Sequence, residues 1–225
     1  MKEDVFRKLP FKMLKARSGF ATCARESKIY FCGGNGGGSA SGGSILKRFD
    51  CLDLKKGKWS KLQDLNVRRD ELQVCMGPDG CIYAIGGFGM VSSDTSTEAT
   101  AACLNSAERY DFETQAWTML PPMTDARRAL AVVAIPDGIY AIGGYDGSKY
   151  LATVEKFCLV QHKWTKVKQM NTARCTLSAV PSADCQYIYV IGGYNGQALD
   201  LVERYSVLSD TWEFMPSMLT KRFMH

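Results

Sequence analysis

The nonapeptide Ile139-Tyr-Ala-Ile-Gly-Gly-Tyr-Asp-Gly147 contains the pattern that decides the fold of this chain, a short apolar run stopped by two glycines. The pattern returns almost unchanged as Ile188-Tyr-Val-Ile-Gly-Gly-Tyr-Asn-Gly196. Earlier copies begin at Ile29 and Ile82, and the dipeptide Ile-Tyr opens all four. We therefore expect one structural unit to occur four times.

Three further landmarks keep the same register in every copy. Tryptophan stands at positions 59, 117, 164 and 212, with an aromatic residue or leucine seven positions before it and an arginine ten positions after it. The last two intervals between tryptophans are 47 and 48 residues. Self-similarity at a period of about 50 residues indicates a stacked repeat architecture.

Within each unit the apolar pattern is that of β-strands. Runs of β-branched and aromatic residues end at glycine, and 129–135 is continuously apolar, as in a strand that is buried on both faces. No window has the stripe of an amphipathic helix. We therefore expect an all-β fold of four-stranded antiparallel sheets repeated radially, which is a β-propeller. Two insertions, 35–44 and the segment near 92–106, are expected to be surface loops.

We interpret the whole chain, 1–225, as a single propeller domain with four complete blades and partial ones on either side. Residues 1–16 are expected to form the outer strand of a preceding blade, and 220–225 to begin a further blade. Such an arrangement favours a longer propeller; a compact ring of four blades and an open array completed by another chain are the alternatives. The complete blades are predicted at 17–66, 67–124, 125–171 and 172–219.

The composition is that of a globular protein, with 225 residues of which 46% are hydrophobic and 23% charged. A net charge of +5 that is dispersed along the chain argues against nucleic acid as a partner. The longest apolar run is far shorter than the roughly 20 residues that cross a bilayer, so no membrane association is expected. Nine cysteines without a CxxC pair favour a reducing compartment, cytoplasmic or nuclear.

The double glycine, the Glu-x-Tyr segment and the tryptophan seven residues later resemble the kelch repeat, and the similarity covers nearly the whole chain. The two nonapeptides are most similar to the kelch domains of kelch-like (BTB-kelch) proteins. The resemblance implies a kelch-type β-propeller that binds a protein or peptide partner at one mouth of its central channel. If a longer product supplies an adaptor domain, it also implies the substrate-recognition part of a cullin-dependent ubiquitin ligase.

The repeat arginines Arg17, Arg69, Arg127 and Arg174 have two interpretations that the sequence leaves open. In the first, each guanidinium ties one blade to the next, because a half-buried arginine needs acceptors for its five donors. In the second, the resemblance places each arginine and its successor near the binding mouth, where several kelch proteins bind acidic or polar segments. By that resemblance these four residues and Arg128 are candidate partner-binding residues.

Aromatic residues follow the double glycine in three copies, as Phe88, Tyr145 and Tyr194, and the turn residues Asp146 and Asn195 come next in two of them. Loops on a rigid scaffold carry recognition, and tyrosine is frequent at interface hot spots. The resemblance places these loops at the binding mouth, so all five are candidate partner-binding residues. The alternative is a tyrosine that merely covers a turn.

The sequence contains few residues of the types that carry out catalysis. Its two histidines are His162 and His225, so neither a histidine metal site nor a Ser-His-Asp relay is expected. We therefore expect a non-enzymatic protein without cofactor or metal. Two alternatives remain open: a propeller enzyme that acts on a sugar or a small oxidisable substrate, and a cytoskeletal scaffold that binds actin.

Overall fold

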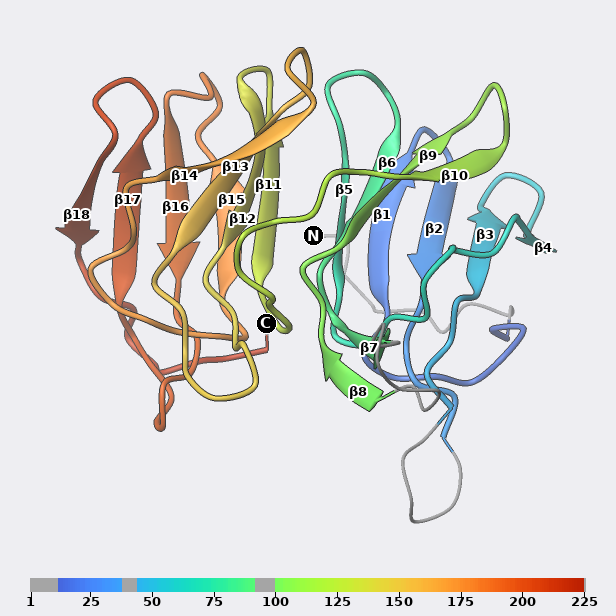
Figure 1. Cartoon of the computed structure of the whole chain (residues 1–225), viewed down its shortest axis with the longest axis horizontal. Helices are drawn as coiled ribbons and strands as arrows, with labels where there is room; N and C mark the ends of the chain where they lie inside the picture. The colour runs from blue at the N-terminus through green and yellow to red at the C-terminus, as the bar shows by residue number, and fades with distance from the viewer. Residues whose placement is uncertain (1–11, 38–43, 92–99, 225) are drawn as a thin grey trace, which may run out of the picture.

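The computed structural model describes residues 12–37, 44–91 and 100–224, and within these ranges the regular secondary structure is entirely β (Figure 1). The strands are β1 (Ala21–Arg25), β2 (Lys28–Cys32), β3 (Phe49–Asp53), β4 (Lys58–Lys61), β5 (Gln73–Met76), β6 (Ile82–Ile85), β7 (Phe88–Val91), β8 (Thr100–Cys103), β9 (Ala107–Asp111), β10 (Ala116–Met119), β11 (Ala131–Ile135), β12 (Gly138–Ile142), β13 (Val154–Cys158), β14 (Lys163–Val167), β15 (Ser178–Pro181), β16 (Tyr187–Ile191), β17 (Val202–Ser206) and β18 (Thr211–Met215). In the described part of the chain, no helix has the length and apolarity needed to span a bilayer.

Four antiparallel sheets of four strands each account for all but two of these strands. Their orders are β1-β2-β3-β4, β5-β6-β9-β10, β11-β12-β13-β14 and β15-β16-β17-β18, so each sheet pairs strands that are near neighbours in the chain. The Ile-Tyr segment of each repeat forms the second strand. The predicted all-β architecture of four-stranded antiparallel blades is confirmed.

The insertion in the second blade differs from the prediction of a surface loop over 92–106. Its last part forms β8, which pairs with β7 from Phe88 opposite Cys103 to Val91 opposite Thr100. The pairing gives backbone groups on both segments hydrogen-bond partners, which an open loop would leave to solvent. Residues 92–99, and residues 38–43 of the other predicted loop, lie outside the described residues.

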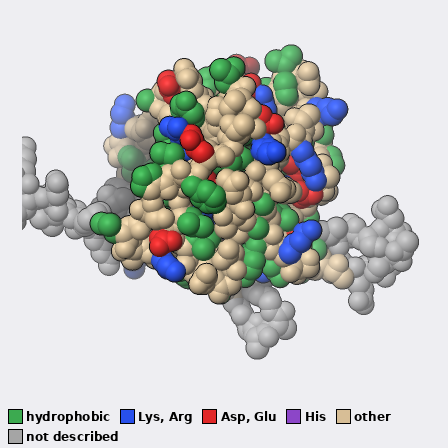
Figure 2. Space-filling model, turned by 90° about the vertical axis from the view of Figure 1, so that its left-hand side faces the viewer, with side chains coloured by type: hydrophobic (Ala, Val, Ile, Leu, Met, Phe, Trp, Pro, Cys, Tyr) green, Lys and Arg blue, Asp and Glu red, His purple; other side chains and the backbone are tan. Residues whose placement is uncertain are grey.

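Hydrophobic cores fill the spaces between adjacent sheets. Between the first and second blades, the ring of Phe49 lies 4.8 Å from that of Tyr110 and 5.1 Å from that of Trp117, centroid to centroid. Equivalent clusters join the second blade to the third and the third to the fourth. The last sheet is less covered on one face: Val180 is 45% exposed, whereas Val133 at the same repeat position of the third blade is 3% exposed. On the side of the molecule that Figure 2 shows, hydrophobic side chains are interspersed with charged ones.

Backbone hydrogen bonds also join successive blades. The N–H of the second glycine in each Gly-Gly pair donates to the carbonyl oxygen of the arginine that opens the next repeat, with N···O distances of 2.7–2.9 Å. The pairs are Gly34 with Arg69, Gly87 with Arg127, Gly144 with Arg174, and Gly193 with Arg222. The same carbonyl oxygen leaves no room for a side chain on the first glycine of the pair, because a Cβ on Gly33, Gly86 or Gly143 would lie 2.4–2.7 Å from it.

A second series of inter-blade bonds follows the propeller axis, two residues after each repeat arginine. Glu71 donates its N–H to the carbonyl oxygen of Gly19 at 2.9 Å, and Ala129 donates to Glu71 at 2.9 Å. Thr176 and Met224 continue the series, with N···O distances of 2.7 and 3.0 Å. All five residues have positive φ, between 48° and 60°. The chain therefore turns sharply at the same point of every repeat.

Partial blades are predicted at the two ends of the chain. Residues 12–16 contain no strand, and 1–11 lie outside the described residues, so the expected outer strand in 1–16 stays a prediction. Near the other end, Arg222 donates its N–H to the carbonyl oxygen of Leu199 at 3.0 Å. Residues 222–224 therefore repeat the contacts that open the earlier blades, and the assignment of 220–225 to a further blade also stays a prediction.

Substitution of Gly144 tests the close approach of backbones. A Cβ on Gly144, where φ is +105°, would lie 2.8 Å from the carbonyl oxygen of Arg128. Gly147 has the same φ of +105°, but a Cβ there would meet only the sulfur of Cys103 at 3.8 Å. We expect Gly147→Ala to lower the free energy of unfolding by about 1–2 kcal/mol through backbone strain alone, and Gly144→Ala to cost about 2 kcal/mol more.

The measurement is urea unfolding followed by tryptophan fluorescence on both variants and the unsubstituted chain. Equal losses of unfolding free energy in the two variants would show that the close approach at Gly144 adds nothing to the strain.

Candidate functional site

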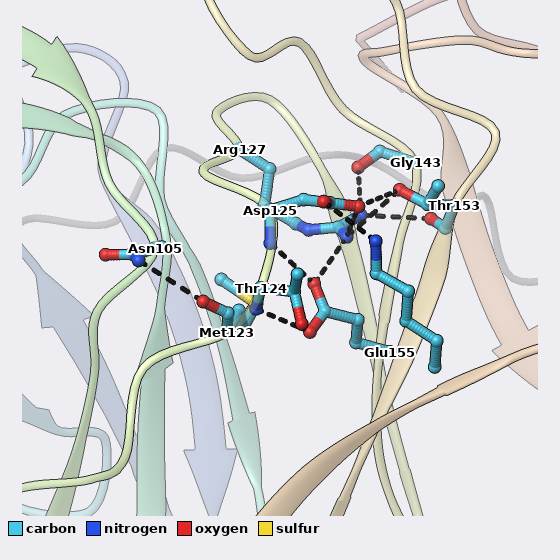
Figure 3. A network of polar contacts seen from close by, with 9 residues as sticks. Asn105, Met123, Thr124, Asp125, Arg127, Gly143, Thr153 and Glu155 are labelled. Atoms are coloured by element: carbon cyan, nitrogen blue, oxygen red, sulfur yellow. Dashed lines mark hydrogen bonds and ion pairs between the residues drawn. The ribbon is translucent and has the colours of Figure 1, made fainter.

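Arg127 is the centre of a buried polar network where the chain enters the third blade (Figure 3). Its guanidinium donates to the carbonyl oxygen of Gly143 at 2.8 Å and to Oε1 of Glu155 at 2.9 Å. The same carboxylate accepts the backbone N–H groups of Thr124 and Asp125, at 2.7 and 3.0 Å. The network therefore fastens the crossover from the second blade onto the sheet of the third.

The arginine–carboxylate pair recurs in the other three blades, and in the second and fourth blades the glutamate again accepts two backbone N–H groups of the crossover. The ion pairs are Arg17–Asp50 at 2.7 Å, Arg69–Glu108 at 2.9 Å and Arg174–Glu203 at 2.6 Å. In the first blade an aspartate replaces glutamate, and it also receives a hydrogen bond from Nε of Arg48 at 2.7 Å. Each repeat arginine thus bonds acceptors of its own blade, and the backbone carbonyls of Arg69, Arg127 and Arg174 also accept the bond from the preceding blade.

The four repeat arginines do not reach a partner at the mouth. The side chains of Arg17, Arg69, Arg127 and Arg174 are 0% exposed, and each guanidinium donates to two backbone carbonyls or more as well as to a carboxylate. Burial lowers the pKa of Arg127, and the negative charge of Glu155 opposes that shift. This burial argues against the expectation that these four side chains contact a partner, because their Nη groups already donate to acceptors within the blade.

Arg128 has a different environment from its buried neighbour. Its side chain is 34% exposed, and its guanidinium carbon lies 5.2 Å from the ring centroid of Phe88 and 5.4 Å from that of Tyr145. Nη1 of Arg128 lies 3.4 Å from a carboxylate oxygen of Glu71, which belongs to the second blade. The predicted residues Arg128, Phe88 and Tyr145 are therefore in contact, and Glu71 joins them.

An aromatic row continues from Tyr145 across the third and fourth blades. We use this name for Tyr145, Tyr150, Tyr194 and Phe223, whose successive ring centroids are 5.5, 6.0 and 5.4 Å apart. The three tyrosines are half-buried, and Phe223 is 46% exposed. Because all four rings retain exposed surface, the row offers a continuous apolar strip to a partner.

A pocket of about 290 Å³ opens beside the aromatic row. We call it the mouth pocket; its lining residues are Glu71, Arg128, Ala129, Tyr145, Tyr150, Cys175, Thr176 and Tyr194. The structure therefore brings together three residues that the sequence singled out as binding candidates, namely Arg128, Tyr145 and Tyr194. Glu71 and Tyr150 were missed. Their signal lies in the repeat numbering, since Glu71 stands two residues after a repeat arginine and Tyr150 in the loop after a double glycine.

Asp146 and Asn195 shape the loops beside the mouth pocket and do not line it. Oδ1 of Asp146 accepts the N–H groups of Ser148 and Lys149, both at 2.8 Å. Partial burial raises the pKa of Asp146, but these hydrogen bonds outweigh it and hold the pKa below its ordinary value. Asn195 starts the equivalent turn, donating its N–H to the carbonyl oxygen of Gln197 at 3.2 Å. Direct contact of Asp146 and Asn195 with a partner stays a prediction.

Breaking the ion pair of Arg127 and that of Arg128 in turn distinguishes a buried structural pair from a pair at the surface. We expect Glu155→Gln to lower the free energy of unfolding by about 3–5 kcal/mol, because it removes the buried charge that pairs with Arg127 and leaves only the longer contact to Asp125 at 3.4 Å. Arg128→Gln should cost less than about 1 kcal/mol, the usual limit for an exposed ion pair. Urea unfolding of both variants, monitored by circular dichroism, measures the difference. A loss for Arg128→Gln as large as that for Glu155→Gln would contradict the assignment of Arg128 to the surface.

Comparison with known proteins places these repeats in a family. The kelch motif matches residues 16–66, 75–124, 126–171 and 176–219. Kelch domain-containing protein 8B of Homo sapiens is 30% identical over 149 residues, which are 64% of this chain and 41% of that protein. Kelch-like protein 25 of Xenopus tropicalis is 25% identical, covering 90% of this chain and 41% of its own length.

Kelch-like protein 28 of Homo sapiens is 37% identical over 109 residues, which are 46% of this chain and 19% of that protein. This chain therefore matches less than half the length of each of these relatives. Because the motif matches four successive repeats and most of the sequence, the chain belongs to the kelch-repeat family.

Proposed function

We propose that this chain is a protein-interaction module that binds a segment of a partner protein at the mouth pocket. Its kelch repeats and kelch-like relatives support an interaction module. The observation that carries the choice of site is the pocket of about 290 Å³, lined by three tyrosines and Arg128. Tyrosine and arginine are among the residues that contribute most to binding at protein interfaces.

The scaffold holds these side chains in place before a partner arrives. Arg128 and Tyr145 exchange two backbone hydrogen bonds, with N···O distances of 3.0 and 2.9 Å. Cys175 and Tyr194 do the same in the next blade, both at 2.9 Å. A surface that is ordered in advance loses less conformational entropy on binding. The loops after the double glycines are therefore suited to recognition.

Binding, not catalysis, is the role that the site supports. The repeat carboxylates Glu108, Glu155 and Glu203 are 0% exposed, and each is engaged by a buried arginine. Carboxylates held in this way are not available to a substrate in the channel. His162 lies in the turn between β13 and β14 and packs 6.2 Å from the ring of Phe157. We accordingly propose a non-enzymatic protein.

A finer proposal concerns the fate of the bound partner. We infer that a longer product, acting in the cytoplasm, recruits its partner to a cullin-dependent ubiquitin ligase through a region outside this sequence. The similarity to kelch-like protein 25, of which the alignment covers 41%, supports this role. Its test is purification of the endogenous product with its associated proteins. A cullin should co-purify, and its absence at saturating recovery of the product would count against the ligase role.

The binding site is tested with a random peptide library displayed on phage and selected on the whole chain. We expect Tyr145→Ala and Tyr194→Ala each to weaken binding of the selected peptides at least about tenfold, a loss of about 1.4 kcal/mol, because tyrosine is frequent among the residues that dominate binding energy. Fluorescence anisotropy with synthetic versions of the peptides provides the dissociation constants.

The matched control is Tyr187→Ala. Tyr187 is a half-buried tyrosine at the start of β16, where Arg204 stacks on it at 4.3 Å, and it does not line the mouth pocket. This variant should bind like the unsubstituted chain. Peptides that lose affinity with Tyr187→Ala and keep it with the two mouth variants would place the binding surface elsewhere.

A further inference from the structure

We propose that the mouth pocket selects an uncharged, proline-rich segment in the polyproline II conformation, and that Glu71 sets this selectivity by pairing with Arg128. The inference rests on the proposed function and names the chemistry of the partner. It departs from an acidic partner, which the positions of the repeat arginines alone would suggest.

Two opposite charges lie side by side at the mouth pocket. The repeat arginines are buried and committed, so Arg128 is the cation that lines the pocket. Its one acidic neighbour in the lining is Glu71, 3.4 Å away. An acidic segment meets repulsion from Glu71 and a basic segment meets repulsion from Arg128. Such juxtaposed charges act against the wrong partner as well as for the right one.

The rings of the aromatic row are spaced almost evenly. Its successive ring centroids are 5.4–6.0 Å apart. A polyproline II helix rises about 3.1 Å per residue, so two of its residues span nearly the same distance. A segment that lies along the row therefore passes one ring for every two residues. Grooves lined with aromatic residues are the surfaces that recognise this conformation in other domains.

The mouth pocket presents hydrogen-bond donors beside its apolar rings. Proline lacks an N–H group, so a proline-rich segment presents carbonyl acceptors and few donors. The pocket supplies donors, because Tyr150 and Tyr194 contribute hydroxyl groups and Arg128 contributes a half-exposed guanidinium. Burial raises the pKa of the Cys175 thiol, which therefore adds no charge to the lining. Apolar rings flanked by donors match a ligand of apolar rings and acceptors.

The experiment uses the whole chain and three labelled nonapeptides: three repeats of Pro-Pro-Leu, alternating Glu and Gly, and alternating Lys and Gly. Fluorescence anisotropy at physiological ionic strength should show the proline peptide binding at least about tenfold more tightly than either charged peptide, a difference of about 1.4 kcal/mol. Tyr150→Ala should remove most of that affinity, because it interrupts the aromatic row.

Glu71→Gln tests the selectivity itself. We expect this variant to bind the acidic peptide at least about fivefold more tightly than the unsubstituted chain does, since Arg128 is then free. Adding Arg128→Gln should abolish that gain. Glu113→Gln is the matched control, because it removes an exposed carboxylate in the turn between β9 and β10 and should leave all three affinities unchanged.

Two results would overturn the inference: tighter binding of the acidic peptide than of the proline peptide by the unsubstituted chain, or no gain in acidic binding with Glu71→Gln. The peptides from phage selection separate this failure from that of the proposed function. Peptides that depend on Tyr145 and Tyr194 but are acidic would end the selectivity proposal and leave the binding site standing. Peptides that ignore both tyrosines would end both.

Discussion

A buried guanidinium that must find acceptors for its donors is the constraint on which this structure depends. In each blade the repeat arginine donates to a glycine carbonyl, a second carbonyl and a buried carboxylate, as the Nη groups of Arg127 do with Gly143, Thr153 and Glu155, while Nε of Arg127 has no acceptor among the described residues. In the second, third and fourth blades the same carboxylate also accepts two N–H groups of the crossover between blades. Burying an ion pair of this kind costs desolvation free energy. Its main effect is therefore to fix one geometry for every repeat, and its net contribution to stability is smaller.

The mouth is built directly on this fixed geometry. Because Arg127 points into the blade and Ala129 turns at positive φ along the axis, the residue between them, Arg128, is left facing the mouth. Its backbone pairing with Tyr145 then brings the loop after the double glycine to the same place. Buried Arg127 is thus followed directly by partly exposed Arg128, and a repeated scaffold is able to carry a variable surface.

The repeats made the fold predictable, because four copies of one spacing leave few architectures in which each copy packs like the last. The candidate site was only partly predictable. Arg128, Tyr145 and Tyr194 follow from their repeat positions, whereas Glu71 reaches Arg128 from a different blade, and sequence spacing does not show which positions meet across blades. Repetition also concealed the burial of the four arginines, since a position that recurs in every unit suits a structural role and a binding role equally well. The β7–β8 hairpin escaped notice because its Ala- and Thr-rich second strand lacks the apolar alternation of the others.

The bonds from each second glycine to the following arginine join nearest neighbours only, so the propeller behaves as a linear array in which stability is the sum of single blades and the interfaces between them. The fourth blade has one such interface with a preceding sheet, and the mouth pocket straddles it, with Tyr145 on one side and Tyr194 on the other. A ligand that spans both tyrosines would act as a clamp across this joint. Occupancy of the mouth and docking of the last blade are thereby thermodynamically linked, and a partner that binds here also holds the propeller together.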